Sequence, residues 1–314
     1  MGNLSRKTHG LLLVALGVAT WALLPLALKP AATVVKPLLL VFARFLAACL
    51  LLLPYVVILS LRYKTSVWRA MWGSKGLILL LMLLGFIIPQ LCFTWTLGRE
   101  FVGLVVFIVY SYPCFSVLFA RWLLGEKLHP AFFGVFVVLV LGLFLVHGAS
   151  SSGNALDAPR ALSVLVALVV SICWGASTVI SKRLLNLDLP SPVVAYARMS
   201  AGVLSLFPLF VLVGGFDASE WSGMTQGAWL GLAFAAVVPV SIGLPAYMAG
   251  LKRVKVVEAS ILEAWTPVLA AVLAVPYFGE NLDPMQWVGG GLIVLASVLA
   301  GMSRTGAPTS ASTP

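Results

Sequence analysis

The chain has 314 residues, of which 61% are hydrophobic and 10% are charged. A soluble domain carries about 25% charged residues, so this composition excludes a soluble globular protein. The net charge of +10 is explained by orientation in a membrane and does not indicate a nucleic-acid partner.

Ten apolar runs follow one another along the chain, and each is long enough to cross a lipid bilayer as a helix. Proline, glycine and charged residues separate the runs and mark the helix ends. The expected spans are residues 10–28, 36–60, 76–97, 101–124, 131–148, 161–181, 190–213, 227–250, 256–276 and 284–302. The first run follows basic residues, as in a secretory signal, but it continues past Trp21, so we interpret it as a span.

The loops between these runs are short and leave no room for a soluble domain. A polar segment, SSSGNALDAPR, separates two halves of similar length. We therefore predict a first half at residues 10–148, a linker at 149–160 and a second half at 161–302. Residues 303–314 are small and polar, and we expect them to be disordered.

The distribution of basic residues predicts which side of the membrane each loop faces. With the N-terminus in the cytoplasm, the outer loops hold four basic residues: Lys29, Lys36, Arg99 and Arg160. The cytoplasmic segments then hold 14, from Arg6 to Arg304. We expect an integral, multi-pass protein of the prokaryotic inner membrane with both termini in the cytoplasm.

Residues of the first half recur 154 positions later in the second half. Arg44, Pro54 and Pro113 match Arg198, Pro208 and Pro267, and the segment GEKLHP at 125–130 matches GENLDP at 279–284. Each half contains five expected spans, an odd number, so the second half enters the membrane in the opposite orientation. We predict an all-α membrane protein of ten transmembrane helices, arranged as two inverted five-helix repeats with the substrate site between them. GE(K/N)LxP is then part of the scaffold, because it occurs once on each face.

Three paired stretches carry a family resemblance: TWALLPLALK with CWGASTVISK, ARFLAACLLLLP with ARMSAGVLSLFP, and YP…GEKL with TP…GENL. With these, the chain resembles EamA-type members of the drug/metabolite transporter superfamily over residues 10–302. The resemblance implies a ten-helix transporter of small metabolites, often an exporter. It also implies a cavity lined mainly by helices 1, 3, 4, 6, 8 and 9, with helices 5 and 10 at the periphery.

Glu263 is an acidic residue inside an expected span, and its repeat equivalent is Val109. Ionisable residues within spans are costly and therefore mark candidate functional sites. We expect Glu263 to bind a substrate amine or to carry a coupling proton. The alternative is a structural carboxyl group, hydrogen-bonded where the helix is interrupted near Pro267.

Arg44 and Arg198 lie well inside expected spans, away from the span ends where the other basic residues gather. Because they are repeat-related, we interpret them as a structural pair that caps carbonyl groups or extends to the membrane interface. Binding of a substrate carboxylate is the alternative.

Aromatic and polar side chains on the expected cavity helices supply the remaining candidates. Together with Glu263, the predicted substrate-binding residues are Trp21, Trp174, Trp265, Trp95, Tyr110, Tyr112, Tyr247, Gln90 and Ser177. Aromatic walls bind amines and aromatic groups through stacking and cation–π contacts. Anchoring at the membrane interface is the alternative for the tryptophans and tyrosines, and helix–helix packing is the alternative for the polar residues.

The sequence favours a secondary transporter that exports small organic metabolites, with amino acids or related amines as substrates, by alternating access. Partners are the substrate and the lipid bilayer, with proton coupling and a homodimer as further expectations. An exchanger of anionic metabolites such as nucleotide sugars or phosphates is one alternative, and a channel or structural membrane protein is another. No catalytic motif, metal-ligand cluster or cofactor motif is present in the sequence, so we expect neither an enzyme nor a cofactor.

Overall fold

The computed structural model describes residues 2–63, 72–125, 132–148, 158–187, 190–254, 256–280 and 282–302. All regular elements in these ranges are helices. Those of the first half are α1 (Gly2–Ala32), α2 (Pro37–Tyr63), α4 (Lys75–Met82), η1 (Leu83–Ile87), α5 (Ile88–Leu97), α6 (Val102–Val109), α7 (Tyr112–Leu124) and α8 (Phe132–Gly148). Those of the second half are α9 (Ala158–Leu185), α10 (Ser191–Leu212), η2 (Ala218–Trp221), α11 (Gln226–Ala235), η3 (Ala236–Gly243), α12 (Leu244–Arg253), α13 (Val256–Glu263), α14 (Thr266–Phe278) and α15 (Pro284–Met302). The described helix α9 begins within the expected linker, whose residues 149–157 lie outside the described ranges, as does the expected tail at 303–314.

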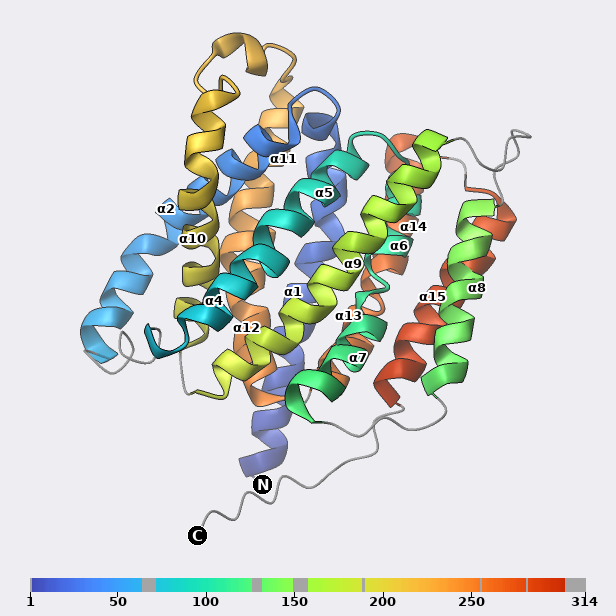
Figure 1. Cartoon of the computed structure of the whole chain (residues 1–314), viewed down its shortest axis with the longest axis horizontal. Coiled ribbons are helices and arrows are strands. Elements are labelled where there is room, and N and C mark those ends of the chain that lie inside the picture. Colours follow the sequence, from blue (N-terminus) through green and yellow to red (C-terminus); the bar gives the residue numbers. More distant parts are fainter. Residues whose placement is uncertain are drawn as a thin grey trace.

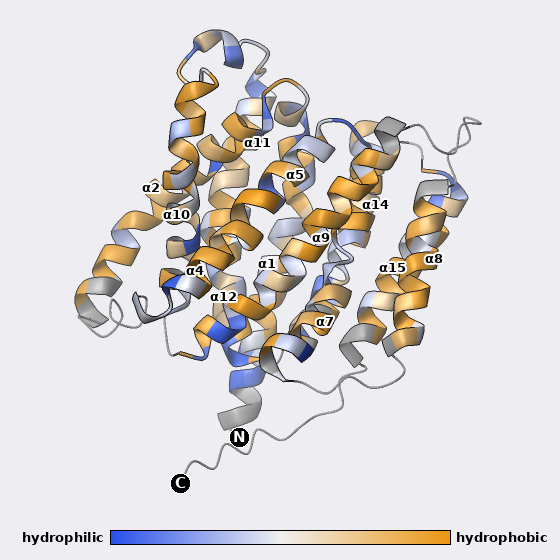
Figure 2. Ribbon diagram, viewed as in Figure 1, coloured by the Kyte–Doolittle hydropathy of each residue, from blue (hydrophilic) through white to orange (hydrophobic). Residues whose placement is uncertain are grey.

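Within the described residues, eight helical segments are long and apolar enough to cross a membrane. They coincide with eight of the expected spans, and the other two, 131–148 and 284–302, coincide with shorter apolar helices. Apolar residues occupy most of each helix, whereas hydrophilic residues gather mainly near the helix ends (Figure 2). Large apolar side chains such as Leu12, Leu50 and Phe133 are more than half exposed on the outer surface, a pattern that requires contact with lipid. The chain is an all-α, multi-pass integral membrane protein.

Four of these segments are interrupted, at corresponding places in the two halves. The π-helical turns η1 and η3 interrupt the third and eighth expected spans, and each is followed by a proline, Pro89 or Pro245. Two-residue turns separate α6 from α7 and α13 from α14, again just before a proline, Pro113 or Pro267. Proline lacks the N–H that continues a helix, and in a membrane the freed carbonyl groups need partners or a polar cavity.

The same helix–helix contacts occur twice, with the roles of the two halves exchanged. Helix α1 of the first half packs on α12 and α14 of the second half, and α9 of the second half packs on α5 and α7 of the first half. The helices α2 and α10 pack on each other, as do α6 and α14 and, at the edge of the bundle, α8 and α15 (Figure 1). The inner helices of the two halves therefore lie against one another around the centre of the molecule.

The GENL segment has an observable structural role. Gly279 ends α14 with φ = 64°, and Gly125 ends α7 with φ = 68°, a conformation that glycine adopts without strain. The next residue, Glu280, accepts hydrogen bonds from the backbone N–H groups of Val102 (2.6 Å) and Gly103 (3.0 Å) at the start of α6. The matching residue in GEKL, Glu126, lies outside the described residues.

Candidate functional site

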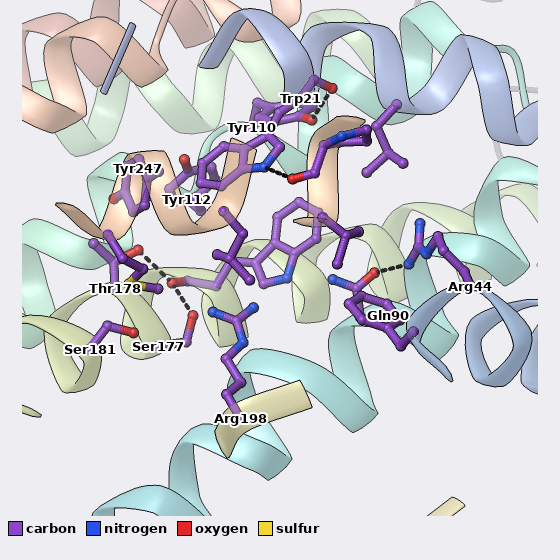
Figure 3. Close-up of a pocket in the computed structure, with 17 residues that line it drawn as sticks. Trp21, Arg44, Gln90, Tyr110, Tyr112, Ser177, Thr178, Ser181, Arg198 and Tyr247 are labelled. Atoms are coloured by element: carbon purple, nitrogen blue, oxygen red, sulfur yellow. Dashed lines mark hydrogen bonds between the residues drawn. The ribbon is translucent and has the colours of Figure 1, made fainter. Parts of the chain in front are cut away.

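A cavity lies where the inner helices of the two halves meet (Figure 3). Its empty space is about 720 Å³, including the part that opens to the outside. Its wall is formed by side chains of α1, α2, α5, α7, α9, α10, η3 and α12 and by Tyr110 in the turn after α6. The labelled lining residues are Trp21, Arg44, Gln90, Tyr110, Tyr112, Ser177, Thr178, Ser181, Arg198 and Tyr247.

Aromatic rings form one side of the cavity. The ring centroids of Trp21 and Tyr247 are 4.6 Å apart, and Trp174 lies about 6 Å from both Tyr110 and Tyr112. The Trp21 indole donates to the carbonyl oxygen of Pro239 (3.2 Å), and the Tyr110 hydroxyl donates to the carbonyl oxygen of Trp21 (3.2 Å). Backbone carbonyls therefore hold this aromatic wall, one of them in the π-helical turn η3.

Two buried arginines occupy other parts of the wall. Nη2 of Arg44 donates to Oε1 of Gln90 (2.5 Å), and its guanidinium lies 4.5 Å from the ring centroid of Phe45. Nη2 of Arg198 donates to the carbonyl oxygen of Gly85 in η1. Nε of each arginine and Nη1 of Arg44 have no hydrogen-bond partner among the described residues. The salt bridges described are Lys7–Glu258 and Lys36–Glu220, so neither cavity arginine is paired with a described carboxylate.

A stripe of hydroxyl groups on α9 completes the polar surface. The hydroxyls of Ser177 and Thr178 donate to the carbonyl oxygen of Trp174 at 2.9 and 3.1 Å, which leaves their lone pairs available as acceptors. The Ser181 hydroxyl, one turn further along α9, has no partner in the described part of the chain. These three residues and Trp174 all line the cavity.

Glu263 is fully buried at the end of α13 and does not belong to the cavity wall. The hydroxyls of Tyr112 and Tyr247 interact with its carboxyl group, but neither contact has the geometry of a good hydrogen bond. Because both tyrosines line the cavity, Glu263 lies one side chain behind the wall. A direct contact between this carboxyl and a substrate amine does not fit the present arrangement.

The cavity brings together most of the predicted site residues. Trp21, Trp174, Tyr110, Tyr112, Tyr247, Gln90 and Ser177 all line it. Trp265 and Trp95 do not. Trp265 is 55% exposed in the turn between α13 and α14. It follows Glu263 by two positions, and the turn between α13 and α14 directs it away from the buried carboxyl. Trp95 stacks on the guanidinium of Arg99, 4.1 Å from the ring centroid, at the end of α5.

The structure adds residues that the sequence analysis did not assign to the cavity. Arg44, Phe45 and Arg198 bring α2 and α10 into the wall, and among the described residues no side chain of α13 or α14 lines it. The family resemblance therefore omits two helices that line the cavity, the second (α2) and the seventh (α10). It also includes the ninth (α13 and α14), which contributes no described lining residue. The available signal was the presence of two cations in apolar spans with no acidic neighbour on the same helix. The carbonyl groups of Gly85 and Pro239 lie in the π-helical turns and accept hydrogen bonds from Arg198 and Trp21. No feature of the sequence predicts these two contacts.

Comparison with known proteins places the chain in a family. Residues 8–148 and 161–302 match the EamA-like transporter family. A probable terminal-alkyne amino-acid exporter of Streptantibioticus cattleyicolor is 29% identical over 72% of each chain. The uncharacterized inner membrane transporter YedA of Escherichia coli K12 is 26% identical over 85% of this chain and 82% of its own length. A solved crystal structure with 22% identity covers 95% of this chain and 98% of its own, with a TM-score of 0.67, and shares the fold. The chain belongs to the EamA-like transporter family.

Proposed function

We propose that this protein is a secondary transporter that exports small organic metabolites, with amino acids or related amines as the substrate class. The observation that carries the proposal is the cavity between the inner helices, whose wall combines aromatic rings, hydroxyl groups and two arginines. A pocket with apolar walls and a few convergent polar groups is typical of a small-molecule site. The name of the Streptantibioticus relative, an amino-acid exporter, supports this substrate class.

Alternating access between two inverted five-helix repeats is the mechanism that we propose. The interruptions of the third and fourth spans recur at corresponding places in the second half, at η3 and between α13 and α14, and the same helix–helix contacts occur twice with the roles of the two halves exchanged. In transporters built from inverted repeats, interrupted helices surround the substrate and one bundle moves against the other. The halves at residues 10–148 and 161–302 are the proposed repeats.

The proposed orientation places both termini in the cytoplasm of the inner membrane. The excess of basic residues on that side supports it, as does the name of the Escherichia coli relative, an inner membrane transporter. Proton coupling through Glu263 and assembly into a homodimer are further parts of the proposal.

One alternative, exchange of anionic metabolites such as sugar nucleotides or phosphates, is favoured by a specific observation. The cavity holds two arginines with no described carboxylate partner, and guanidinium groups bind phosphates as well as carboxylates. Against it, the opposite wall is aromatic and offers no further Lys or Arg among the described residues.

Counterflow in proteoliposomes tests the proposed function. Purified protein is reconstituted with unlabelled L-phenylalanine inside, and entry of the labelled compound is followed. A carrier produces transient, saturable accumulation that depends on the internal substrate. Flux that neither saturates nor depends on the internal substrate would identify a channel, and counterflow with UDP-sugars or phosphate but not with L-phenylalanine would establish the alternative.

A further inference from the structure

The cavity carries positive charge that no described residue balances. Arg44 is 1% exposed and Arg198 is 8% exposed, and neither forms a salt bridge with a described carboxylate. The carboxyl group of Glu263 interacts with the wall residues Tyr112 and Tyr247 and lies behind them. Buried charges within a membrane are costly and are found with a partner. An anion that enters the cavity would supply this missing partner.

We infer that Arg198 binds the carboxylate group of the transported substrate, an inference that rests on the proposed function and specifies its substrate class. The ligand is a small monocarboxylate with an apolar or aromatic remainder. Amino acids satisfy this description, whereas polyamines and quaternary amines do not.

Arg198 is better placed for this role than its repeat equivalent, Arg44. The Arg44 guanidinium already has a side-chain acceptor, Oε1 of Gln90, and lies over the ring of Phe45. Arg198 has no such side-chain acceptor among the described residues, and its Nε is without a hydrogen-bond partner there. It donates to the backbone carbonyl of Gly85, and its guanidinium points toward the middle of the cavity (Figure 3).

The surroundings of Arg198 suit a carboxylate. Ser177 and Arg198 are neighbours, because both pack against Gly85. Ser181, one turn further along α9, also lines the cavity, and its hydroxyl has no partner among the described residues. A carboxylate held by a guanidinium has further lone pairs, and a neighbouring hydroxyl can donate to one of them. Arg198 and Ser181 together therefore provide charge and a second donor from α10 and α9.

The rest of the cavity selects what is attached to the carboxylate. Trp21 and Tyr110 lie on the other side of the cavity from Arg198 and Ser181 (Figure 3), and the ring of Trp174 packs on Tyr110 and Tyr112. Such aromatic surfaces bind apolar and aromatic groups. No carboxylate side chain lines the wall among the described residues, so an ammonium group on the substrate has no ionic partner there. We expect the carboxylate to be required for binding and the amine to be dispensable.

Three probes of similar size separate these requirements. L-phenylalanine carries both charged groups, 3-phenylpropionate carries the carboxylate alone, and 2-phenylethylamine carries the amine alone. Binding to the purified full-length protein in detergent is measured by isothermal titration calorimetry at fixed pH and salt. We expect the two carboxylates to bind at least about tenfold more tightly than the amine. Equal or tighter binding of 2-phenylethylamine, or no binding of either carboxylate, would overturn the inference.

The variant Arg198→Gln tests the assigned residue. Loss of a charged hydrogen-bond donor predicts a 10- to 100-fold weaker affinity for both carboxylates, by about the worth of a hydrogen bond to a charged group. The control Arg183→Gln removes an exposed arginine from α9 and should leave affinity unchanged. Arg198→Lys keeps the charge and should restore part of the affinity, which separates loss of the anion site from misfolding. Unchanged carboxylate affinity in Arg198→Gln would reject the assignment.

Counterflow distinguishes failure of this inference from failure of the proposed function. Saturable counterflow with unchanged carboxylate affinity in Arg198→Gln leaves the transporter intact and removes the Arg198 site. Carboxylate binding that depends on Arg198 without any counterflow supports the site and rejects the transporter.

Discussion

At the scale of single residues, Glu263 is the clearest departure from the repeat. Its equivalent, Val109, is a fully buried apolar residue, whereas Glu263 places a carboxyl group between the hydroxyls of Tyr112 and Tyr247. Both its oxygen atoms lack a well-formed hydrogen bond among the described residues. Burying a carboxylate without such bonds is costly, and this cost makes a functional role for Glu263 worth testing.

Replacement of Glu263 by Gln tests whether this carboxyl carries the coupling proton. The amide keeps the shape but cannot exchange a proton, so we expect uptake of L-phenylalanine driven by an imposed pH gradient to fall at least about tenfold. Counterflow without a gradient should persist, because exchange needs no net proton movement. Proteoliposome flux measures both quantities.

Glu258→Gln is the matched control, since Glu258 lies on the same helix and pairs with Lys7 near the surface. Gradient-driven uptake by Glu263→Gln equal to that of the wild-type protein would remove Glu263 from the coupling mechanism.

At the scale of elements, Glu280 connects the two halves by capping a helix of the first half from a loop of the second. The first N–H groups of a helix have no partner within it, and the carboxylate of Glu280 accepts from two of them, on Val102 and Gly103. A negative charge at a helix N-terminus is also favourable because of the helix dipole. The GE pair therefore turns the chain at Gly279 and fixes the start of α6.

Substitution Glu280→Ala should lower the stability of the protein by about 1–3 kcal/mol, because two buried backbone donors lose a charged acceptor. Thermal unfolding in detergent, followed by circular dichroism, measures the effect. The control Glu220→Ala removes the partner of Lys36 at the surface, and an exposed pair of this kind contributes less than about 1 kcal/mol. Equal shifts in the two variants would contradict the capping role.

Features of this site that depend on local sequence can be predicted, whereas features that depend on packing between helices cannot. The positions of the spans and of their interruptions follow from apolar length and from prolines such as Pro113 and Pro267, which act locally. The direction of a side chain next to an interruption does not follow, since a two-residue turn rotates Trp265 to the outside while Glu263 stays buried. The partners of Arg44 and Arg198 also could not be predicted, because each contact forms only when separate helices pack: α2 on α5 within the first half for Arg44 and Gln90, and α10 on η1 across the two halves for Arg198 and Gly85.

At the scale of the whole molecule, two lysines hold equivalent ends of the halves. Near the end of α1, Nζ of Lys29 donates to the carbonyl oxygen of Glu100, after α5. Near the end of α9, Nζ of Lys182 donates to the carbonyl oxygens of Leu251 (2.6 Å) and Val254 (2.9 Å), at and after the end of α12. Glu100 and Val254 are 154 residues apart, so each lysine ties the first segment of its half to the third.

Under alternating access, each of these contacts stabilises closure on one side of the membrane. In the proposed orientation Lys29 lies on the outer side and Lys182 on the cytoplasmic side, so Lys29→Met should favour outward opening and Lys182→Met inward opening.

A Ser177→Cys probe in the cavity wall, in a background without the four native cysteines, reports the open side through its reaction with a membrane-impermeant thiol reagent. We expect Lys29→Met to speed labelling several-fold from the outer side and Lys182→Met to speed it from the cytoplasmic side. The control Lys36→Met, which removes a surface pair with Glu220, should change neither rate. Identical rate changes from both sides in either variant would show that the lysines stabilise the fold without setting the direction of opening.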